Sequence, residues 1–571
     1  MYRTHRPNWI VRPRDYDFET QLSASLGLPS IVGSVLRNRG VDTLDKARDF
    51  LTPSLSLLHD PFRLLEMAAA VDRIAFALAR RETILVHGDY DVDGVTSAAL
   101  LIRFLSKLGG DIQYYIPHRM HDRYGLGARA IRQAAEAGAK LVIAVDCGVS
   151  DRASVALARE LGMDVIIIDH HEPPEELPEG AIIVDPKRAE CDYPERELAS
   201  VGLAFKVASA LCERLNMPQA SMQRAFLDLV ALGTIADVAP LLGENRTMTS
   251  AGLQLLPQTR KAGLQALMRL CNLGETVRAS DVAFRLAPRI NAVGRMGDAA
   301  DALDLFLTDD DVEATRLALH LDSLNRQRQQ EQEATFREAF RRIEDEIDLD
   351  EHHVVVLSAP HWHAGILGIV AAKVLQVHGR PAILLTEEDG EMRGSARSIP
   401  GFDIAAALEQ CSECLLRYGG HSLAAGLALN AHDLEEFRQR LNTIAADSLA
   451  GVDLTPRIEA DAEVTLAEIT PDLIAGLDRV QPCGHGNAVP MFVASGVEIL
   501  ECRAVGGEGQ HLKLYVTQSG RTLDCIGFGL GRECENHDRR DEVDLCFTPE
   551  INEYNGNRGI QLRLEGIRAA G

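Results

Sequence analysis

Four short stretches of the sequence combine carboxylate and imidazole side chains in patterns that suit divalent metal ions. Carboxylate oxygens and imidazole nitrogens together are ligands of Mn²⁺, with Mg²⁺ and Zn²⁺ as alternatives. Such ions activate water in hydrolases, so the residue types point to metal-assisted hydrolysis. The side chains concerned are His87, Asp89, Asp91, Asp93, Asp146, Asp169, His170, His171 and Asp237.

The number of these candidates favours two ions over one. About five or six carboxylate and imidazole ligands are more than a single ion needs if positions must stay open for a substrate. Two ions about 3.5–4 Å apart, bridged by one carboxylate and one water, fit better. Carboxylates packed this densely would also repel one another strongly without cations. We therefore expect a two-metal phosphodiesterase, in which a bridging water made acidic by both ions attacks phosphorus in line.

Each stretch taken alone has a simpler structural explanation. An aspartate directly after a strand, such as Asp146, is often only a helix cap. An Asp-x-Asp sequence is often part of a solvated loop, and neighbouring histidines are more often surface residues than ligands. All four stretches, however, fall at the ends of strands or helices of one predicted domain. This coincidence favours the metal interpretation.

The elements expected around these residues form a parallel sheet covered by helices. Short apolar runs rich in β-branched residues alternate with helical segments, which is typical of parallel strands buried on both faces. Ligands bind outside the carboxyl ends of such strands, so distant segments would meet at one edge of the sheet. The predicted strands are 83–86, 112–116, 140–145, 165–168 and 181–184, with helices at 95–108 and 151–161, and residues 200–270 mostly helical.

The remaining sequence predicts further domains on either side of this sheet. A charged helical pattern within 306–350 predicts one long helix, roughly 55–60 Å at about 1.5 Å per residue. We interpret it as a spacer that connects two domains, and a solvated coiled-coil arm is the alternative. The C-terminal region alternates short strands and turns, with a hairpin signal at Asn555-Gly556, as in a small β-barrel. The predicted divisions are a helical lead-in (1–55), the catalytic α/β domain (56–305), the connecting helix (306–350), a second α/β domain (351–452) and the barrel (453–571).

Composition limits the class of protein. A chain of 571 residues is too long for one core. The net charge of −25 argues against a protein that coats nucleic acid, but metal ions and a locally basic channel would still allow a nucleic-acid enzyme. No apolar run reaches the roughly 20 residues that span a bilayer, and the N-terminus lacks the apolar stretch of a signal peptide. The eleven scattered cysteines, including Cys411 and Cys414, are expected to be buried reduced thiols in the cytoplasm.

The motifs resemble those of the DHH phosphoesterase superfamily, named after the sequence at Asp169-His170-His171. Within it, residues 87–94, 145–148 and 233–240 look like the RecJ branch, the single-strand-specific 5′→3′ DNA exonucleases of bacteria. Residues 419–426 resemble the DHH-associated (DHHA1) substrate domain, and the long helix and barrel resemble the RecJ connecting helix and OB-fold. The resemblance covers nearly the whole chain. It implies an exonuclease that releases 5′-mononucleotides in DNA repair and recombination and uses two Mn²⁺ or Mg²⁺ ions.

The resemblance also implies a role for each candidate residue. Asp146 would bridge the ions, Asp89 would act beside the ligands, and His171 would contact the scissile phosphate. Ordinary surface ion pairs remain the alternative explanation for the arginines. In the barrel, Tyr515, Phe528 and Tyr554 are candidates for base stacking, but we expect half or more of these side chains to lie in its core. The implied metal ligands are His87, Asp91, Asp93, Asp146, His170 and Asp237, and the implied DNA- or phosphate-binding residues are Arg119, Tyr124, Arg295, Arg397, Gly420 and His421.

Two other functions and one departure from the family remain to be weighed. A pyrophosphatase, or a phosphodiesterase for very short oligonucleotides or cyclic dinucleotides, would lack the terminal barrel. A non-catalytic scaffold would have lost metal ligands, whereas every expected one is present. Residues 481–487 depart from the Pro-Phe-Gly-x-Gly-Asn pattern of the family, which should affect the packing of the barrel.

The partners implied by the resemblance follow from the expected activity. They are single-stranded DNA with a 5′ end, a single-strand-binding protein and a RecQ-type helicase, with no membrane and a monomeric enzyme. Single-strand preference would come from a passage between the two α/β domains that is too narrow for duplex DNA.

Overall fold

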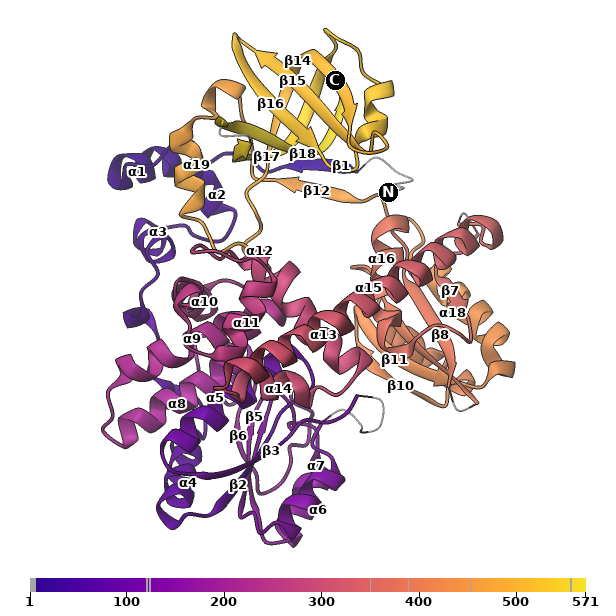
Figure 1. Ribbon diagram of the computed structural model, residues 1–571. Coiled ribbons are helices and arrows are strands. Elements are labelled where there is room, and N and C mark those ends of the chain that lie inside the picture. The colour runs from indigo at the N-terminus through magenta and orange to yellow at the C-terminus, as the bar shows by residue number, and fades with distance from the viewer. Residues whose placement is uncertain are drawn as a thin grey trace. The chain divides into compact units, whose positions relative to one another are not determined.

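The computed structural model describes residues 7–119, 122, 125–349, 351–388, 390–452, 454–554 and 557–570. The chain divides into two compact units. The larger comprises residues 11–323 and 460–571, and the smaller comprises residues 324–459 with the first residues of the chain. Helix α15 (Asp311–Glu346) contributes to both and confirms the predicted long helix, at about 54 Å for its 36 residues (Figure 1).

The larger unit contains the predicted parallel sheet, with five strands (Figure 1). The chain enters at the second position of the sheet, crosses to one edge, and then returns to build the other side. The order of strands therefore reverses between β2 and β4, which is where ligands bind in open α/β sheets. The strands, in spatial order, are β3 (Asp111–Tyr115), β2 (Thr83–His87), β4 (Leu141–Val145), β5 (Asp164–Ile168) and β6 (Ile182–Val184).

Helices cover both faces of this sheet, because its central strand, β4, is apolar at every position. All five residues of β4 are buried. Helices α6 (Ala128–Glu136) and α7 (Arg152–Glu160) share one core cluster with Leu85, Val142 and Ile167. The helices of the other face, and those that pack behind them, are α4 (Met67–Arg80), α5 (Val92–Lys107), α8 (Ser200–Arg214), α9 (Gln219–Ala236), α10 (Gly243–Leu255), α11 (Ala262–Leu270), α12 (Ala279–Asp281), α13 (Ala287–Met296) and α14 (Ala300–Leu307).

The same unit contains the predicted barrel, whose strands are longer than the apolar runs suggested. Pairing of β14 with β17 closes the sheet, as an OB-fold requires. The predicted turn at Asn555-Gly556 lies outside the described residues, and the flanking strands pair antiparallel. The strands are β13 (Ala462–Glu463), β14 (Phe492–Val505), β15 (His511–Gln518), β16 (Arg521–Gly527), β17 (Glu542–Tyr554) and β18 (Asn557–Ala569).

The N-terminal helices are part of the barrel core, which the sequence did not suggest. Phe18 and Leu22 belong to the same buried cluster as Leu473 and Phe492. Residues from both ends of the larger unit's sequence thus pack together in the core of the barrel. The helices involved are α1 (Tyr16–Leu26), α2 (Ile31–Arg37), α3 (Leu44–Leu51) and α19 (Pro471–Asp478).

A buried arginine joins the barrel region to the helices of the catalytic part. The guanidinium of Arg246, on α10, donates hydrogen bonds to backbone carbonyl oxygens, including those of Phe50 (3.0 Å) and Val480 (2.9 Å). Further carbonyl acceptors lie in residues 479–482, and the Asn487 amide donates to two of the same carbonyls. The stretch that departs from the family pattern thus wraps around Arg246 and packs the barrel region onto α10.

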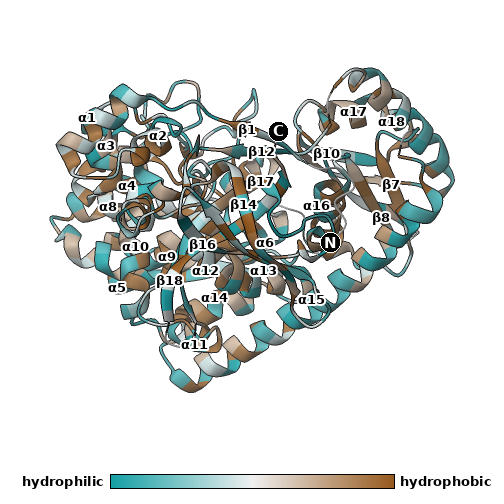
Figure 2. Cartoon of the chain, turned by 90° about the horizontal axis from the view of Figure 1, so that it is seen from above, coloured by the Kyte–Doolittle hydropathy of each residue, from teal (hydrophilic) through white to brown (hydrophobic). Residues whose placement is uncertain are grey.

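The smaller unit is a mixed five-stranded sheet with helices on both faces, as predicted for a second α/β domain. Hydrophobic residues are concentrated along β7 and β8 (Figure 2). Cys411 and Cys414 are buried free thiols, as predicted. Among the described residues, no helix is long and apolar enough to cross a membrane. The elements are β7 (Val355–Ser358), α16 (Leu367–His378), β8 (Ala382–Glu388), β9 (Glu391–Arg397), α17 (Ile404–Gln410), β10 (Arg417–His421), β11 (Ala424–Leu429) and α18 (Leu434–Ser448), with β12 (Arg457–Ala460) pairing with β1 (Asn8–Val11).

Candidate metal centre

The turn after β2 brings three aspartates to the start of α5. The Asp91 carboxylate accepts the backbone N–H of Gly94 at 3.0 Å and caps the helix, which therefore begins at Val92, three residues before the predicted start. A Cβ on Gly94 would lie 2.6 Å from the backbone of Asp89, so the turn folds back on the helix and only glycine fits there. The fold-back holds Asp89 beside the first turn of α5.

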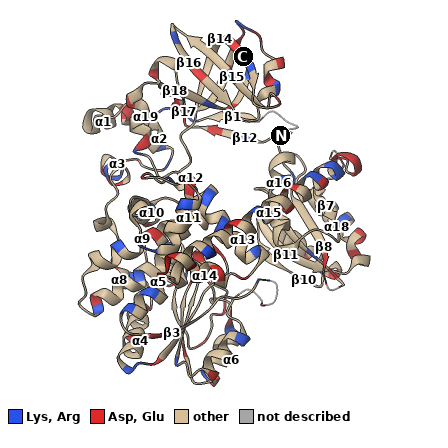
Figure 3. Cartoon of the chain, in the orientation of Figure 1, with Lys and Arg blue, Asp and Glu red and all other residues tan. Residues whose placement is uncertain are grey.

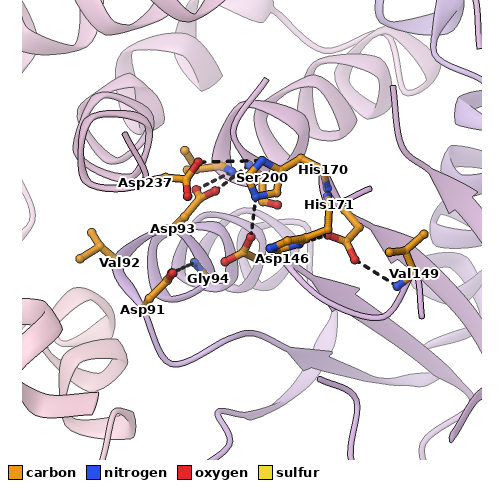
Figure 4. Close-up of polar contacts among 12 residues, drawn as sticks. Asp91, Val92, Asp93, Gly94, Asp146, Val149, His170, His171, Ser200 and Asp237 are labelled. Atoms are coloured by element: carbon orange, nitrogen blue, oxygen red, sulfur yellow. Dashed lines mark hydrogen bonds and ion pairs between the residues drawn. The ribbon is translucent and has the colours of Figure 1, made fainter. Parts of the chain in front are cut away.

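Asp93 is fixed by the start of a second helix. Its two carboxylate oxygens accept the backbone N–H groups of Ser200 (2.7 Å) and Val201 (2.9 Å), at the beginning of α8 (Figure 4). The first N–H groups of a helix have no partner within it, and the helix dipole favours an anion there. The buried carboxylate is thus held in one orientation by backbone donors from more than a hundred residues away.

Asp146 and Asp169 follow β4 and β5, where the strands end. Asp146 has a φ of 62°, a left-handed conformation that few non-glycine residues adopt. The buried Asp169 accepts hydrogen bonds from the Val149 N–H (3.0 Å) and from His171 Nδ1 (2.7 Å). Asp169 therefore orients the loop and the ring of His171, whereas the Asp146 carboxylate lies next to the ring of His170.

The structure brings candidate ligand side chains into two adjoining sets, and a third set of Asp146, His170 and His171 overlaps both of them. Figure 4 shows most of these side chains. In each set, one ligand atom per residue lies within 4.8 Å of the others. Asp146 Oδ1 also lies 3.2 Å from Nε2 of His170, so it adjoins the second set as well as the first. The first set is Asp89, Asp91 and Asp146, and the second is Asp93, His170 and Asp237.

The electrostatics of the cluster fit bound cations. Burial, reinforced by the neighbouring carboxylates, raises the pKa of Asp89, Asp93 and Asp146 well above the usual range of aspartate. Burial and the charge of Asp91 raise the pKa of Asp237 to about 7. Oδ1 of Asp89 is buried and has no hydrogen-bond partner among the described residues. A mixed oxygen and nitrogen donor set with this unbalanced charge suits Mn²⁺ or Mg²⁺.

His170 and His171 are neighbours with opposite protonation. Burial, together with the charge of His171, lowers the pKa of His170 to about 4, so its ring is neutral at pH 7 and able to act as a ligand. Burial also opposes protonation of His171, but the hydrogen bond and charge of Asp169 outweigh it and raise that pKa to about 9. The His171 ring is therefore a cation at pH 7.

His87 lies apart from the two ligand sets. Its buried ring stacks on Tyr115 at a centroid distance of 5.5 Å, and Nδ1 lies 3.6 Å from the Cys147 sulfur. Burial lowers its pKa to about 4. Nε2 has no hydrogen-bond partner among the described residues, which leaves that nitrogen available to an ion. Asp89 lies within the first set, and its expected role beside the ligands stays a prediction.

Two of the predicted phosphate-binding arginines lie next to the metal-ligand turn. The guanidinium of Arg119 lies 4.9 Å from the ring centre of Tyr90, and Arg119 and Arg295 both act on the pKa of Tyr90, which burial raises to about 12. A Cβ on Gly294 would lie 2.7 Å from the Tyr90 carbonyl oxygen, so α13 approaches the turn closely. Tyr124 lies outside the described residues.

The other predicted DNA-binding residues lie in the smaller unit. Arg397 donates to Ser395 Oγ (3.0 Å) and lies against the first turn of α16 at Gly368. Gly420 has a φ of 148°, and a Cβ there would lie 2.4 Å from the Ala424 carbonyl oxygen, so β10 requires glycine at this point. His421 is exposed at the end of the same strand.

The barrel aromatics are more exposed than expected. Phe528 is 62% exposed and Tyr515 36%, so neither belongs to the core and both remain available for stacking. The side chain of Tyr554 lies outside the described residues.

Two residues near the cluster were missed from the sequence. Asp185 follows β6 and is buried, which raises its pKa to about 7. Lys187 carries a charge that acts on the pKa of both Asp237 and His170, and its Nζ lies 3.3 Å from a Glu172 carboxylate oxygen. The signal for Asp185 was present, since it follows the predicted strand 181–184 in the same way as Asp146 and Asp169 follow theirs.

Comparisons with known proteins agree on one family. Sequence models of three families match the chain: the DHH family, N-terminal domain, at residues 83–234, the DHHA1 domain at 351–447, and the RecJ OB domain at 460–566. The single-stranded-DNA-specific exonuclease RecJ of Bacillus subtilis (strain 168) is 38% identical over 98% of this chain and 70% of its own length. That of Dickeya dadantii (strain 3937) is 35% identical over 96% of this chain and 97% of its own length.

Solved structures give the same result. The crystal structure of RecJ in complex with Mn²⁺ from Thermus thermophilus has a TM-score of 0.86 and 32% identity, and the match covers 99% of this chain and 80% of that one. The crystal structure in complex with Mg²⁺ from the same organism has a TM-score of 0.79 and 30% identity, covering 99% and 79%.

Proposed function

Because the chain belongs to the RecJ family of single-stranded-DNA-specific exonucleases, we propose that it hydrolyses single-stranded DNA from the 5′ end. The products would be 5′-mononucleotides. The observation that supports this proposal is that the candidate ligand sets meet around Asp146, where the order of strands reverses.

The proposed metal ligands divide between two ions. Asp89 and Asp91 would hold one, Asp93, His170 and Asp237 would hold the other, and Asp146 would bridge both. His87 remains a further predicted ligand through its unpartnered Nε2. The donor set supports Mn²⁺ or Mg²⁺. When bound, these ions would supply Lewis acidity that activates water and neutralises charge on the phosphate.

The chain's own residues would position the substrate and stabilise charge. His171, protonated at pH 7, would donate a hydrogen bond to a non-bridging oxygen of the scissile phosphate, where negative charge grows in the transition state. Asp169 would hold that ring in place. Arg119 and Arg295 would bind phosphates of the strand. The same proposal assigns strand contacts to Tyr124, Arg397, Gly420 and His421.

The wider role follows from the family. We propose that the protein acts in DNA repair and recombination, as a monomer in the cytoplasm, with a single-strand-binding protein and a RecQ-type helicase as partners. The match to the RecJ OB domain supports binding of single-stranded DNA. The eleven cysteines are free thiols, which supports a reducing compartment.

A digest of end-labelled DNA tests the activity and its polarity. Long single strands labelled at the 5′ or the 3′ end, and the matching duplexes, are incubated with the protein and Mn²⁺ or Mg²⁺. The 5′ label should appear at once as a mononucleotide, whereas the 3′-labelled strand should shorten gradually. Cutting from the 3′ end, or equal use of duplex, would contradict the proposal.

The same digest separates the alternatives. A phosphodiesterase for very short oligonucleotides would leave the long strand intact and degrade only short ones. A non-catalytic scaffold would cut nothing, and the complete ligand set argues against it. An Asp146→Ala variant is the matched control, and full metal-dependent activity in it would overturn the assignment of the site.

A further inference from the structure

A basic pocket lies at the ends of α5 and α9 that point away from the metal ligands. Its volume is about 600 Å³. Residues from three segments line it: the last turns of α5, the first three turns of α9, and the segment that leads into α11. Five cationic side chains face one carboxylate there, namely Arg103, Lys107, Arg224, Arg260 and Lys261 against Asp228.

The pocket differs in charge from the molecule as a whole. The chain has a net charge of −25, and acidic and basic side chains are interspersed along its helices (Figure 3). A local excess of cations in an acidic protein therefore stands out against its surroundings. Because field lines concentrate in a recess with low-dielectric walls, such a pocket attracts anions more strongly than a flat surface does.

Two of the five cations already have acidic partners, which fix the walls of the pocket. Nζ of Lys261 lies 2.7 Å and 2.9 Å from the two carboxylate oxygens of Asp228, which also accepts the Thr259 hydroxyl at 2.6 Å. Arg103 pairs with Asp309 at 2.6 Å and donates to the Phe306 carbonyl oxygen at 2.7 Å. These bonds neutralise the one carboxylate that the described residues contribute to the lining.

The other three cations are exposed and unneutralised. Lys107, Arg224 and Arg260 form no ion pair with any described residue, and the one hydrogen bond of Arg224 is a 3.4 Å contact to a carbonyl oxygen of its own helix. Three cationic side chains without counter-ions around one recess leave it with a net positive charge.

Neutral polar side chains complete the lining of the pocket. Ser221, Gln258 and Thr259 supply further polar groups in the lining.

The pocket is remote from the proposed chemistry. Helices α5 and α9 pack against each other, and each carries a predicted metal ligand at one end and a pocket residue at the other. Fourteen positions of α5 separate Asp93 from Lys107, about 21 Å along the helix. Thirteen positions separate Arg224 from Asp237, about 20 Å. A phosphate bound here cannot be the one that is cleaved.

We propose that this pocket binds a polyphosphate group, either that of a nucleoside di- or triphosphate or that of free inorganic polyphosphate. Its volume lies in the range of small-molecule pockets, which favours a compact, multiply charged anion over a strand of nucleic acid. The three unneutralised cations around one recess match an anion that carries several phosphate groups in a row. The inference does not depend on the proposed exonuclease activity.

Binding is measured by isothermal titration calorimetry on the full chain in EDTA. Without divalent ions the carboxylates of the metal centre repel anions, so that site does not contribute. Adenosine triphosphate and inorganic tripolyphosphate should each bind saturably at one site, and adenosine should not bind. Tighter binding of adenosine triphosphate than of tripolyphosphate would identify a nucleotide ligand, and equal affinity would identify free polyphosphate.

Charge-reversal variants connect the binding to the pocket. Arg224→Glu and Arg260→Glu should each weaken the binding of both polyphosphates at least about tenfold, since each replaces an attraction by a repulsion. Arg269→Glu is the matched control, because Arg269 is an exposed arginine at the far end of α11, and it should keep the wild-type affinity. Circular dichroism of each variant verifies that it is folded.

Three results would overturn the proposal. One is the absence of saturable binding by either polyphosphate. Another is an unchanged affinity in a folded Arg260→Glu variant. The third is a pocket variant that weakens binding of a single-stranded oligonucleotide but not of adenosine triphosphate, since the pocket would then be a nucleic-acid contact. None of these measurements requires hydrolysis, so a failure here is distinct from a failure of the proposed exonuclease activity.

Discussion

At the scale of single residues, the two histidines after β5 divide the chemistry between them. His170 has a pKa of about 4 and remains neutral, as a metal ligand must be. His171 has a pKa of about 9 because of Asp169 and remains cationic, as a group that stabilises a phosphate should be. Burial lowers the pKa of His170, whereas the hydrogen bond and charge of Asp169 raise that of His171. Adjacent residues of the same type thus receive different roles from their surroundings.

A His171→Gln variant should lose activity but keep its metals. The rate constant kcat should fall about 10²–10³-fold, since one charged donor to the transition state is removed. The affinity for Mn²⁺, measured by calorimetry, should stay near that of the wild type. Asp169→Asn should give a similar loss in kcat, because it removes the partner that keeps the ring protonated. Normal kcat in His171→Gln would contradict the assigned role.

Asp146 should destabilise the protein without metal and stabilise it with metal. Burial and neighbouring carboxylates raise its pKa, so its charged form disfavours the folded state in the absence of cations. In EDTA, the free energy of unfolding of Asp146→Asn should therefore exceed that of the wild type by on the order of 1 kcal/mol. The variant should accordingly unfold at a higher temperature. Asparagine tolerates the left-handed backbone conformation at this position, so the comparison is not confounded by strain.

The order of stability of the two proteins should reverse when Mn²⁺ is added, so that the wild type unfolds at the higher temperature. Ligand binding to the folded state stabilises the wild type, and the variant lacks the shared ligand. Thermal unfolding of both proteins, with EDTA and with Mn²⁺, measures the effect. A variant that is stabilised by Mn²⁺ as much as the wild type would show that Asp146 does not bind the ion.

At the scale of elements, the metal centre depends on how helix starts meet strand ends. The sequence predicted the strands after which Asp91, Asp146 and Asp169 follow, because apolar runs and their acidic ends are local patterns. It did not predict that the start of α8 would hold Asp93, because backbone N–H groups leave no trace in residue type. The position of Asp89 likewise depends on the fold-back at Gly94, which no local pattern of residue types indicates.

Gly94→Ala should disrupt the centre. A Cβ at this position would lie 2.6 Å from backbone atoms of Asp89, which cannot move aside as a side chain can. We expect a loss of about 1–3 kcal/mol in the free energy of unfolding, together with loss of Mn²⁺ binding. Denaturant unfolding and calorimetry measure the two effects. Gly274→Ala is the control, because a Cβ there meets open space, and it should change neither the free energy of unfolding nor the binding of Mn²⁺. Unaltered metal binding in Gly94→Ala would contradict the role assigned to the turn.

At the scale of the whole chain, the order of α/β domains, long helix and barrel could be predicted from the sequence. The packing of the N-terminal helices into the core of the C-terminal barrel could not. The barrel strands alternate in a recognisable way, whereas nothing local distinguishes Phe18 or Leu22 as part of that barrel's core. The buried Arg246 was likewise unremarkable as a sequence feature, because its partners are carbonyl oxygens from two distant segments.

Arg246→Met should loosen the attachment of the barrel region. The change leaves several buried carbonyl oxygens without donors, at a cost of about 2–4 kcal/mol. Limited proteolysis should then cut near residues 479–487 faster than in the wild type, and the unfolding temperature should fall. Arg269→Met, at an exposed arginine, should behave as the wild type. Equal cleavage rates in the two variants would argue against this role of Arg246.

The shared core of the N-terminal helices and the barrel also has a consequence during synthesis. Leu22 leaves the ribosome 470 residues before Phe492, its companion in the same core. At about 5–20 residues per second, the apolar faces of α1 and α2 wait roughly 20–100 s for the strands that cover them. The catalytic sheet between them can fold in that interval, so α1 and α2 are buried only after the sheet that follows them in the chain.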